Sequence, residues 1–414
     1  MLKFFLKVYN IMAGGFAQII STGLQDLYLT KNPTINLFQY KYFKYVNFAT
    51  ETVKQHLNDN VEFGQNKITV NILKKGHLLS KMYLNIKLPV LVLVDGTYAC
   101  WADTLGYAFF SQPIELVIGG VIVDRLYGTG LDMMDELTSH IKKTGKDLMI
   151  LKSDMYRSCL YNAKKIIDLM IPLDFWFTKD YSLALPLLAM TNQDISINFY
   201  FKNFDELVNY DGNQGPPLVS VIESFVYIEY IFLDEIILES FQKQKFTYVI
   251  EQMVYNGDEI IPDNQSIFQT QISFKNPCKE ILFACIDLDN IDNNNYFNYS
   301  RRSDGEPLIK EVSLLLDGKH RFDNFLPEHI FRQYFPNNVH SVIPNKHMYT
   351  IPFCTTPESS VQPTGSINLS RFDNITLALN MNKNNNLCQI HIYGIMLNIV
   401  TIENGSLRFE FVNV

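Results

Sequence analysis

One stretch near the middle of the chain, Asp211-Gly212-Asn213-Gln214-Gly215-Pro216-Pro217, most limits what these 414 residues can fold into. Two glycines and a Pro-Pro pair cannot continue a strand or a helix, so the chain must turn or pause here. A glycine-rich phosphate loop would need a helix to start immediately afterwards, where Pro216 and Pro217 stand. We therefore interpret residues 211–217 as a linker between two halves.

The two halves have the same character. Each consists of short runs rich in Val, Ile, Phe and Tyr, separated by Gly, Pro, Asn and Asp. Many short, regularly punctuated strands are typical of a sandwich or jelly roll rather than an α/β sheet, so we expect a duplicated all-β fold. The predicted strands are 37–45, 67–73, 81–93, 114–124, 195–201, 219–232, 247–254, 280–288, 312–316, 348–353, 366–369, 375–379 and 389–400.

Two helices are predicted among these strands. Apolar residues from Leu131 to Ile141 recur at helical spacing, with acidic residues early and lysines late, as the helix dipole favours. Asp234 has the side chain of an N-cap, and the helix that follows it should end near Lys245. Both helices are short, so the architecture stays all-β.

Residues 37–45 place aromatic side chains beside lysines. Such a segment can stack bases and neutralise phosphates, or it can be a strand that covers a sandwich. The net charge of −8 disfavours a protein whose affinity would depend on neutralising phosphates. We therefore favour the strand, and we expect no direct nucleic-acid binding.

Composition narrows the class further. Apolar residues make up 47% of the chain and charged residues 19%, which is typical of globular proteins with large cores. The six cysteines are scattered without Cys-x-x-Cys spacing, which predicts buried thiols in a reducing compartment. No apolar run approaches the ~18–20 residues of a membrane span. The apolar stretch near residues 1–7 is too short for a signal peptide.

Motifs that carry catalysis are missing from the sequence. It has no His-Glu-x-x-His, no Gly-x-Ser-x-Gly and no P-loop. The carboxylate pairs Asp205-Glu206 and Asp234-Glu235 stand at element edges, where solvated or capping acids are common, and residues 289–295 lack the Gly and Glu of a calcium loop. We expect no enzyme, no cofactor and no metal site, although a hydrolase assembled from distant carboxylates stays open.

Several motifs then follow one another in a fixed order. They are Gly14-Gly15, Gly23 to Pro33, Asn47-Phe48-Ala49, Ile118 to Arg125, Leu137-Thr138, Phe175-Trp176-Phe177, Leu183 to Leu187, Tyr230 to Asp234, Leu316 to Phe322 and Gln362 to Asn374. This set resembles the major capsid proteins of the nucleocytoplasmic large DNA viruses, the iridovirus, phycodnavirus and mimivirus lineage. The last two motifs resemble the family's Asn-Gly-x-x-Arg-Phe turn, with Asp317 for Asn, and its Pro-Ser-Gly-x-x-Asn-Phe-Ser-Arg-x-Asp-Asn signature. Met12, just before the glycine pair, is the more family-like start.

The resemblance implies a fold and an assembly. Each chain would form two tandem eight-stranded antiparallel jelly rolls with short inserted helices: an N-terminal arm at 1–30, a first jelly roll at 31–210, the linker at 211–217 and a second jelly roll at 218–414. Three chains would form a pseudo-hexagonal capsomer, since two similar wedges per chain let a three-fold trimer fill a near six-fold site. Neighbouring capsomers, minor capsid and penton proteins and an internal membrane would surround it in a virion assembled in the host cytoplasm.

The resemblance also marks individual residues. The charged pairs Asp124 with Arg125 and Arg371 with Asp373 are interpreted as ion pairs that pin strand ends or the subunit boundary, or as plain surface pairs. The structural residues carried over from the family signatures are Asp124, Arg125, Arg321, Gly365, Ser370, Arg371, Asp373 and Asn374.

Glycan acceptors are the one modification that the sequence specifies. Five Asn-x-Ser/Thr sequons are present, at Asn264, Asn298, Asn368, Asn374 and Asn404. A chain rich in Asn produces such matches by chance, and a cytosolic protein does not meet the usual machinery. We expect Asn298, in the polar loop, and then Asn264 to be used if any is.

Two other functions fit the same sequence. A carbohydrate-binding jelly-roll protein would use exposed aromatic residues and Asn/Asp loops, and it would be a soluble monomer. A minor capsid or assembly-scaffold paralogue would share the fold without being the principal shell protein. The sequence leaves the virus and the lattice number undetermined.

Overall fold

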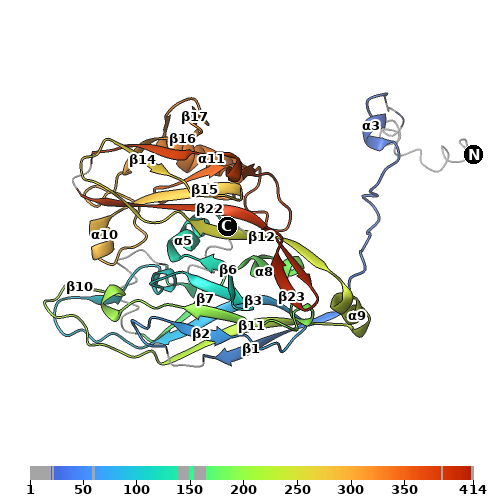
Figure 1. The fold of residues 1–414 in the computed structure, drawn as a ribbon, viewed down its shortest axis with the longest axis horizontal. Helices are drawn as coiled ribbons and strands as arrows, with labels where there is room; N and C mark the ends of the chain where they lie inside the picture. The colour runs from blue at the N-terminus through green and yellow to red at the C-terminus, as the bar shows by residue number, and fades with distance from the viewer. Residues whose placement is uncertain are drawn as a thin grey trace, which may run out of the picture. The chain divides into compact units, whose positions relative to one another are not determined.

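The computed structural model describes residues 20, 23–57, 61–138, 149–152, 165–383 and 386–411. Within these residues most of the regular secondary structure is strand, folded as two β-sandwiches with one helix, α9, between them in sequence (Figure 1). Each sandwich consists of two sheets built on a path of four antiparallel strands. The prediction of an all-β double jelly roll with short helices is confirmed.

The first jelly roll contains sheets of strand order β1-β11-β3-β7 and β2-β9-β5-β6, with β8 paired to β3 and a separate β4-β10 ribbon. Successive side chains of a strand point to opposite faces of its sheet, so a strand with one face on the core alternates between buried and exposed positions. In β5 every second residue is buried. The strands are β1 (Phe48–His56), β2 (Ile68–Asn71), β3 (Leu78–Leu88), β4 (Ala99–Trp101), β5 (Ile114–Ile118), β6 (Val121–Leu126), β7 (Ile167–Pro172), β8 (Leu185–Pro186), β9 (Ile195–Phe199), β10 (Val208–Tyr210) and β11 (Glu223–Leu233).

The second jelly roll repeats this plan with the orders β12-β22-β15-β19 and β14-β21-β16-β17. β13 and β23 pair with β22, β20 pairs with β15, and β18 pairs with β16. The strands are β12 (Phe246–Tyr255), β13 (Glu259–Ile261), β14 (Ile267–Gln271), β15 (Pro277–Asp287), β16 (Ile309–Leu316), β17 (Lys319–His320), β18 (Leu326–Pro327), β19 (Met348–Pro352), β20 (Ile367–Asn368), β21 (Ile375–Met381), β22 (Cys388–Glu403) and β23 (Ser406–Phe409).

Short helices fill the connections. The prediction of a helix after Asp234 is confirmed: α9 begins at the next residue, and the Asp234 carbonyl accepts the amides of Ile237 and Leu238 at 3.0 and 3.1 Å. The other predicted helix is α5, which ends at Leu137; the predicted continuation to Ile141 lies outside the described residues. The helices are α3 (Leu27–Thr30), α4 (Leu105–Ala108), α5 (Gly128–Leu137), α8 (Trp176–Lys179), α9 (Glu235–Lys243), α10 (Leu288–Asp292) and α11 (Phe335–Val339), with single turns η1 (Tyr181–Leu183), η2 (Leu187–Ala189), η3 (Phe204–Glu206), η4 (Ile330–Tyr334) and η5 (Leu369–Arg371).

The boundary between the jelly rolls does not lie at residues 211–217. β11 follows that stretch, yet it pairs with β1 along Phe48–His56 and with β3, so it is an inner strand of the first sheet. The prediction that the second jelly roll starts at residue 218 was therefore wrong. The glycines and prolines at 211–217 correctly indicate a turn, but the same residues are common in turns between strands of one sandwich. The sheet changes only after Leu233, at α9.

The N-terminal boundary also differs from the prediction. Residues 1–47 form a unit separate from residues 48–414, so the arm is longer than the predicted 1–30. Residues 37–45 form no strand, and their side chains are exposed, with Phe38 at 98% and Phe43 at 93%. A β-prone segment becomes a strand only where a neighbouring strand accepts its hydrogen bonds, and sequence preference alone cannot supply one.

Among the described residues, two large hydrophobic cores fill the space between the sheets, and a small third cluster contains Leu78, Ala184 and Ile231. One belongs to the second jelly roll, and the other runs from the first jelly roll into the second. Strand β15 separates them: Leu282 and Ile286 belong to the shared core. Phe283 and Cys285 belong to the second core. Because both faces of this strand are covered, its sequence is almost continuously apolar rather than alternating.

Two smaller predictions concern cysteines and membrane spans. The described cysteines, among them Cys278, Cys285 and Cys354, are buried, as predicted. Burial raises the pKa of the Cys285 thiol well above its ordinary value, which keeps it protonated and unreactive. No helix among the described residues is long and apolar enough to cross a membrane.

Candidate functional site at the junction of the two jelly rolls

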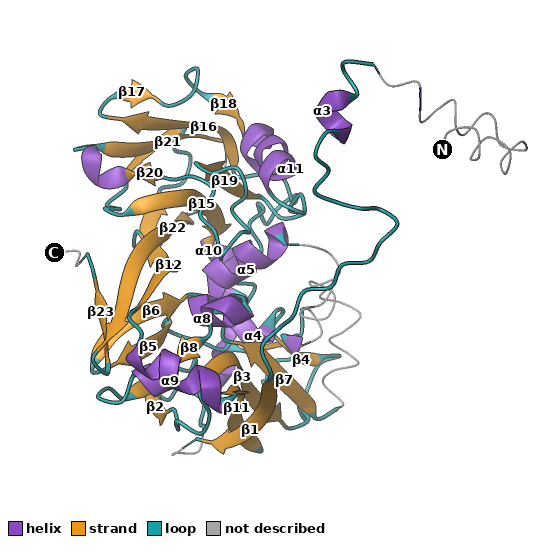
Figure 2. Cartoon of the chain, turned by 90° about the vertical axis from the view of Figure 1, so that its right-hand side faces the viewer, coloured by secondary structure: helices purple, strands orange, loops and turns teal. Residues whose placement is uncertain are grey.

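Helices α5 and α8 of the first jelly roll lie in the layer between the two sandwiches (Figure 2). Strand β12 of the second jelly roll contacts both α8 and β6. This layer, which we call the junction, holds most of the buried charge of the described residues. It determines how one sandwich is oriented against the other.

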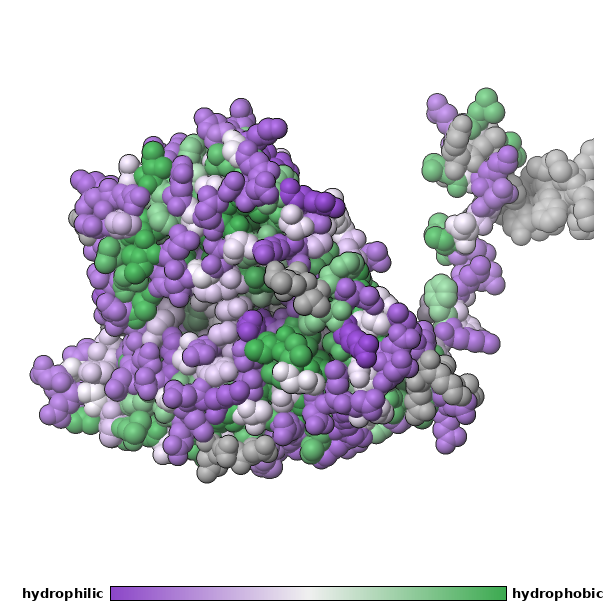
Figure 3. All heavy atoms as spheres, in the orientation of Figure 1, coloured by the Kyte–Doolittle hydropathy of each residue, from purple (hydrophilic) through white to green (hydrophobic). Residues whose placement is uncertain are grey.

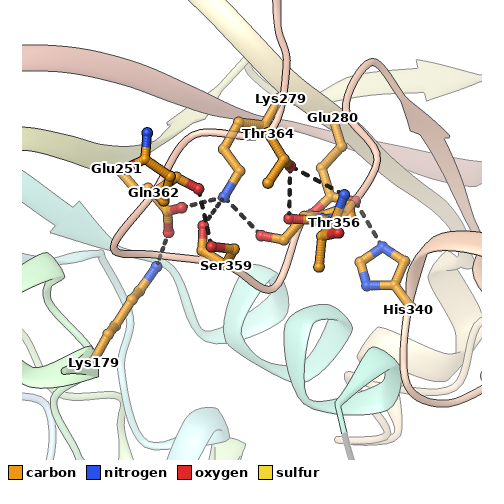
Figure 4. A network of polar contacts seen from close by, with 10 residues as sticks. Lys179, Glu251, Lys279, Glu280, His340, Thr356, Ser359, Gln362 and Thr364 are labelled. Atoms are coloured by element: carbon orange, nitrogen blue, oxygen red, sulfur yellow. Dashed lines mark hydrogen bonds and ion pairs between the residues drawn. The ribbon is translucent and has the colours of Figure 1, made fainter. Parts of the chain in front are cut away.

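The centre of the junction is a buried Lys–Glu–Lys bridge (Figure 4). Lys179, at the end of α8, lies 2.7 Å from one carboxylate oxygen of Glu251 in β12. Lys279 of β15 contacts the other oxygen and is fully buried. It also donates to the carbonyls of Pro357 and Ser359, at 2.7 and 3.0 Å. One carboxylate thus joins the first jelly roll, the second jelly roll and the loop that follows β19.

The protonation states of this bridge follow from its surroundings. Burial alone would raise the pKa of Glu251, but Lys179 and Lys279 outweigh it and hold that pKa below its ordinary value. Burial would likewise lower the pKa of Lys179, yet Glu251 holds it above its ordinary value. Glu251 and Lys179 are therefore both charged at neutral pH, and each stabilises the charge of the other.

Asp124 of β6 lies beside this bridge. Burial raises its pKa to about 7, against the opposing effect of Lys179 and the amide of Arg125. Arg125 does not pair with Asp124: its Nε lies 3.3 Å from Glu115 at the surface. The predicted Asp124–Arg125 ion pair was therefore wrong. Neighbouring residues in a strand point to opposite faces of the sheet.

A second polar cluster lies deeper in the second jelly roll. His340 Nε2 lies 2.9 Å from Glu280 Oε2, and Thr350 donates to the same oxygen at 3.1 Å. Glu358 lies 3.7 Å from the other ring nitrogen. Although burial opposes protonation, Glu280 and Glu358 raise the pKa of His340. The cluster holds the loop after β19 against β15, next to Lys279 (Figure 4).

Helix α5 makes a further link across the junction. Asp132 is buried and accepts from Lys346 Nζ at 2.7 and 2.8 Å. It also accepts from the hydroxyl of Tyr299 at 2.7 Å. Lys152, from the first jelly roll, lies 3.6 Å away. Both Lys346 and Tyr299 belong to the second jelly roll, so this aspartate ties the inserted helix to the other sandwich.

Hydrogen bonds also close the junction at both ends. At one end Gln193 exchanges two bonds with the backbone of Leu407, at 2.6 and 3.2 Å. At the other end Asn294 donates to the carbonyls of Asp205 and Val208, at 2.9 and 3.0 Å. The two sandwiches are thus joined by the Glu251 bridge, by Asp132 and by these two sets of hydrogen bonds. Together these links leave one sandwich little freedom to rotate against the other.

The remaining signature residues lie outside the junction. The two C-terminal motifs are brought together: Asp317 Oδ1 accepts the amides of Asp373 and Asn374, both at 2.9 Å. Asp317 has a φ of 48°, which Asn and Asp adopt more readily than other side chains, so Asp serves here as well as Asn. Among the described ion pairs, none joins Arg371 to Asp373, and that predicted pair was wrong.

Three other signature residues shape turns. Ser370 donates its amide and its hydroxyl to the Asn368 side chain, at 3.1 and 2.6 Å. Gly365 has a φ of 138°, and a Cβ there would lie 3.1 Å from the Phe353 carbonyl oxygen. Arg321 places its guanidinium 5.3 Å from the Phe322 ring centroid. These residues fix local geometry rather than chemistry.

The two favoured sequons differ in exposure. Asn264 is exposed, with a φ of 55° in the turn before β14. Asn298 is half-buried, and its side-chain oxygen accepts both the amide and the hydroxyl of Ser300. Accessibility therefore favours Asn264 over Asn298, the reverse of the predicted order.

The junction residues Lys179, Glu251 and Lys279 were not singled out from the sequence. One signal was available: Lys279 and Glu280 interrupt the apolar strand β15, and charges within a buried strand require partners. Their partners, however, come from another strand and from loops that only the folded chain brings close, so the pairing could not be read from sequence spacing.

Comparison with known families agrees with this architecture. Residues 36–234 match the family model described as the major capsid protein N-terminus, and residues 238–408 match the model of the large eukaryotic DNA virus major capsid protein. The chain belongs to this family of viral capsid proteins. The two matches meet between residues 234 and 238, where the sheets change at α9.

Individual relatives cover nearly the whole chain. The major capsid protein of Pyramimonas orientalis virus is 27% identical over 418 residues, which cover 95% of this chain and 98% of that protein. The major capsid protein of Paramecium bursaria Chlorella virus 1 is 27% identical over 396 residues, covering 89% and 87%. The solved PBCV-1 virus capsid superposes with a TM-score of 0.78 at 20% identity, over 91% of this chain and 100% of that one. The family is structural, so the chain is a structural capsid protein and not an enzyme.

Proposed function

We propose that three copies of the chain form a pseudo-hexagonal capsomer, and that these capsomers tile the outer shell of an icosahedral double-stranded DNA virus. The observation that carries this is the clamped junction. A trimer imitates a hexagon only if both sandwiches of every chain keep one fixed relative orientation. The Lys179–Glu251–Lys279 bridge and the Asp132 links supply that constraint within a single chain.

Exposed surfaces of the chain support this proposal as well. The arm exposes aromatic side chains at residues 38–45, and strand β1 is an edge of its sheet with most residues exposed. Exposed apolar residues and unpaired strand edges are surfaces that assemblies cover. Arg371 and Asp373 lie exposed on the second jelly roll, and we assign them to contacts with adjacent chains. The border between chains should bury more than ~2,000 Å², as obligate interfaces do.

The wider setting follows from the same proposal. The shell would include minor capsid and penton proteins, with a membrane beneath it, and would assemble in the host cytoplasm. The chain would be the principal shell protein rather than a minor paralogue or a transient scaffold. Quantitative mass spectrometry of purified virions separates these roles, because a principal shell protein dominates the particle and a scaffold is absent from it.

Static light scattering of the purified chain tests the trimer. The expected result is three times the chain mass at micromolar concentration, without dissociation on dilution into the nanomolar range, as an obligate interface requires. A monomer at micromolar concentration contradicts the proposal. A Lys179→Ala variant sharpens the test, since a loosened junction should lower the trimer fraction while the strands remain folded.

A further inference from the structure

A cleft of about 640 Å³ opens between the two jelly rolls. Its lining comes from the β4–β5, β6–β7 and β9–β10 connections of the first jelly roll, and from strand β22 and the β12–β13 and β15–β16 connections of the second. Strand β10 and helix α10 mark this end of the molecule, on the left of Figure 1, and Figure 3 shows a recess between the two lobes there. Helix α9 lies at the opposite end. The cleft therefore belongs to the end that carries the long connections.

Aromatic rings form one wall of the cleft. Tyr127, Tyr255 and Tyr393 pack against one another with centroids 4.8 to 5.5 Å apart. Tyr127 and Tyr255 are only half-buried, so ring surface faces the cleft. Across it, Tyr296 is also half-buried and carries Lys202 Nζ 3.1 Å from its ring centroid. Partly exposed tyrosine rings offer flat apolar surface beside a polar edge.

Unused hydrogen-bonding groups surround these rings. Within the described residues, the side chains of Gln112, Asp292 and Gln389 form no hydrogen bond, yet all three line the cleft. The other acids are already occupied. Glu206 accepts from Asn203 at 2.8 and 2.9 Å, and Asp258 accepts from Tyr255. Two free amides and one free carboxylate can bind adjacent hydroxyl groups, donating and accepting in turn.

The charges of the cleft limit what it can hold. Its lining has three carboxylates, Glu206, Asp258 and Asp292, against the single amine of Lys202. Burial lowers the pKa of Lys202 to about 8, which weakens even that charge. Burial also lowers the pKa of His391 to about 4, so this imidazole is neutral. Phosphates, sulfates and sialic acids are therefore disfavoured.

We propose that this cleft binds a neutral pyranose sugar, with its C–H face on the tyrosine wall and its hydroxyls on Gln112, Asp292 and Gln389. The cleft combines exposed tyrosine rings, on which a sugar ring can stack, with planar amide and carboxylate groups that can bind its hydroxyls. This combination suits a sugar better than an anion or a purely apolar ligand. That the cleft opens to the outside of the particle rests on the proposed capsomer. The ligand would then be a glycan on a cell surface or on a neighbouring protein.

Binding of the assembled protein to a panel of neutral oligosaccharides, with sialyllactose and heparin as anionic probes, tests this. The expected result is retention of at least one neutral glycan and of neither anion. Asp292→Ala and Gln112→Ala should each weaken that binding about tenfold, the effect of one lost hydrogen bond to a polar ligand. Asp323→Ala removes another exposed carboxylate, outside the cleft, and should leave the binding unchanged.

Other outcomes overturn the proposal. No retained neutral glycan, equal retention of the anions, or equal losses in Asp292→Ala and Asp323→Ala would each do so. Light scattering on the same samples separates this result from the capsomer. A trimer that binds no sugar rejects the cleft alone. A monomer that binds while the trimer does not shows that a neighbouring chain covers the cleft, which contradicts a site on the particle surface.

Discussion

Strands β15 and β1 have similar lengths and opposite surroundings. Ten of the eleven residues of β15 are buried, because it lies between the two cores. One of the nine residues of β1 is buried, because it is a sheet edge. The chain thus completes its own junction and leaves the far edge of the first jelly roll open. The internal surface determines the orientation of the sandwiches, and the open one remains for other molecules.

Removing the buried amine at the junction should have the largest effect. Lys279→Ala leaves Glu251 with one cation and takes the donor from two carbonyls, so the free energy of unfolding should fall by about 3–5 kcal/mol. Urea unfolding followed by circular dichroism measures this. Lys54→Ala is the control: it removes the exposed Lys54–Glu223 pair between β1 and β11 and a contact with the Phe225 ring, and should cost no more than about 1 kcal/mol. Similar losses in both would show that the junction is no more constrained than the edge.

A glycine substitution tests the loop that covers Lys279. Gly365→Ala adds a Cβ 3.1 Å from the Phe353 carbonyl oxygen at a φ of 138°, so unfolding should become easier by about 1–3 kcal/mol. Gly257→Ala is the control, since Gly257 also has a positive φ but no atom within 4 Å of the added Cβ. The melting temperature should fall further for Gly365→Ala. Equal shifts would mean that the clash is relieved by movement of the loop.

The second polar cluster should make stability depend on pH. Because Glu280 and Glu358 raise the folded pKa of His340, its contribution is full below the unfolded pKa of about 6.5 and is lost as pH rises through the folded value. The difference in unfolding free energy between the native chain and His340→Gln should therefore shrink as pH rises above about 6.5. A difference that grows with pH would reverse the sign of this coupling.

Deleting residues 1–47 should have the smallest effect on stability. The arm is a separate unit, so the remaining chain should unfold within ~0.5 kcal/mol of the full chain. Its trimer, however, should dissociate more readily, as sedimentation at falling concentration would detect. Deletion of residues 1–22 keeps the aromatic segment and is the matched control. A large loss of stability without the arm would show that the arm completes a core of its own chain.

Much of the fold was readable because local patterns decide it. The apolar run at 114–124 predicted one strand, which the structure divides into β5 and β6, and the cap at Asp234 predicted a helix that the structure contains. Residues 211–217 correctly predicted a turn, but the turn lies within the first jelly roll and is not the boundary between the two. Whether a turn ends a domain depends on which strand the next segment pairs with, and β11 pairs with β1, some 170 residues earlier. The sequence near either strand does not show which distant strand it pairs with.

The candidate site was harder to read than the fold. The aromatic residues at 37–45 predicted a strand because they have a high β-propensity. A strand also needs a neighbouring strand to accept its hydrogen bonds, and propensity does not show whether one is present. Lys279 can be recognised in the sequence as a charged residue within an apolar strand. Its neighbours Glu251 and Lys179 come close only when the two sandwiches pack together. The cleft likewise combines strand β22 with connections from both halves, none of which carries a motif.

Electron cryomicroscopy of the purified chain tests the central claim most directly. The account predicts a three-fold particle with six sandwiches around its axis, in which each pair within a chain keeps the orientation set by the Lys179–Glu251–Lys279 bridge. A particle of another symmetry, or single chains whose two sandwiches take several relative orientations, would contradict it.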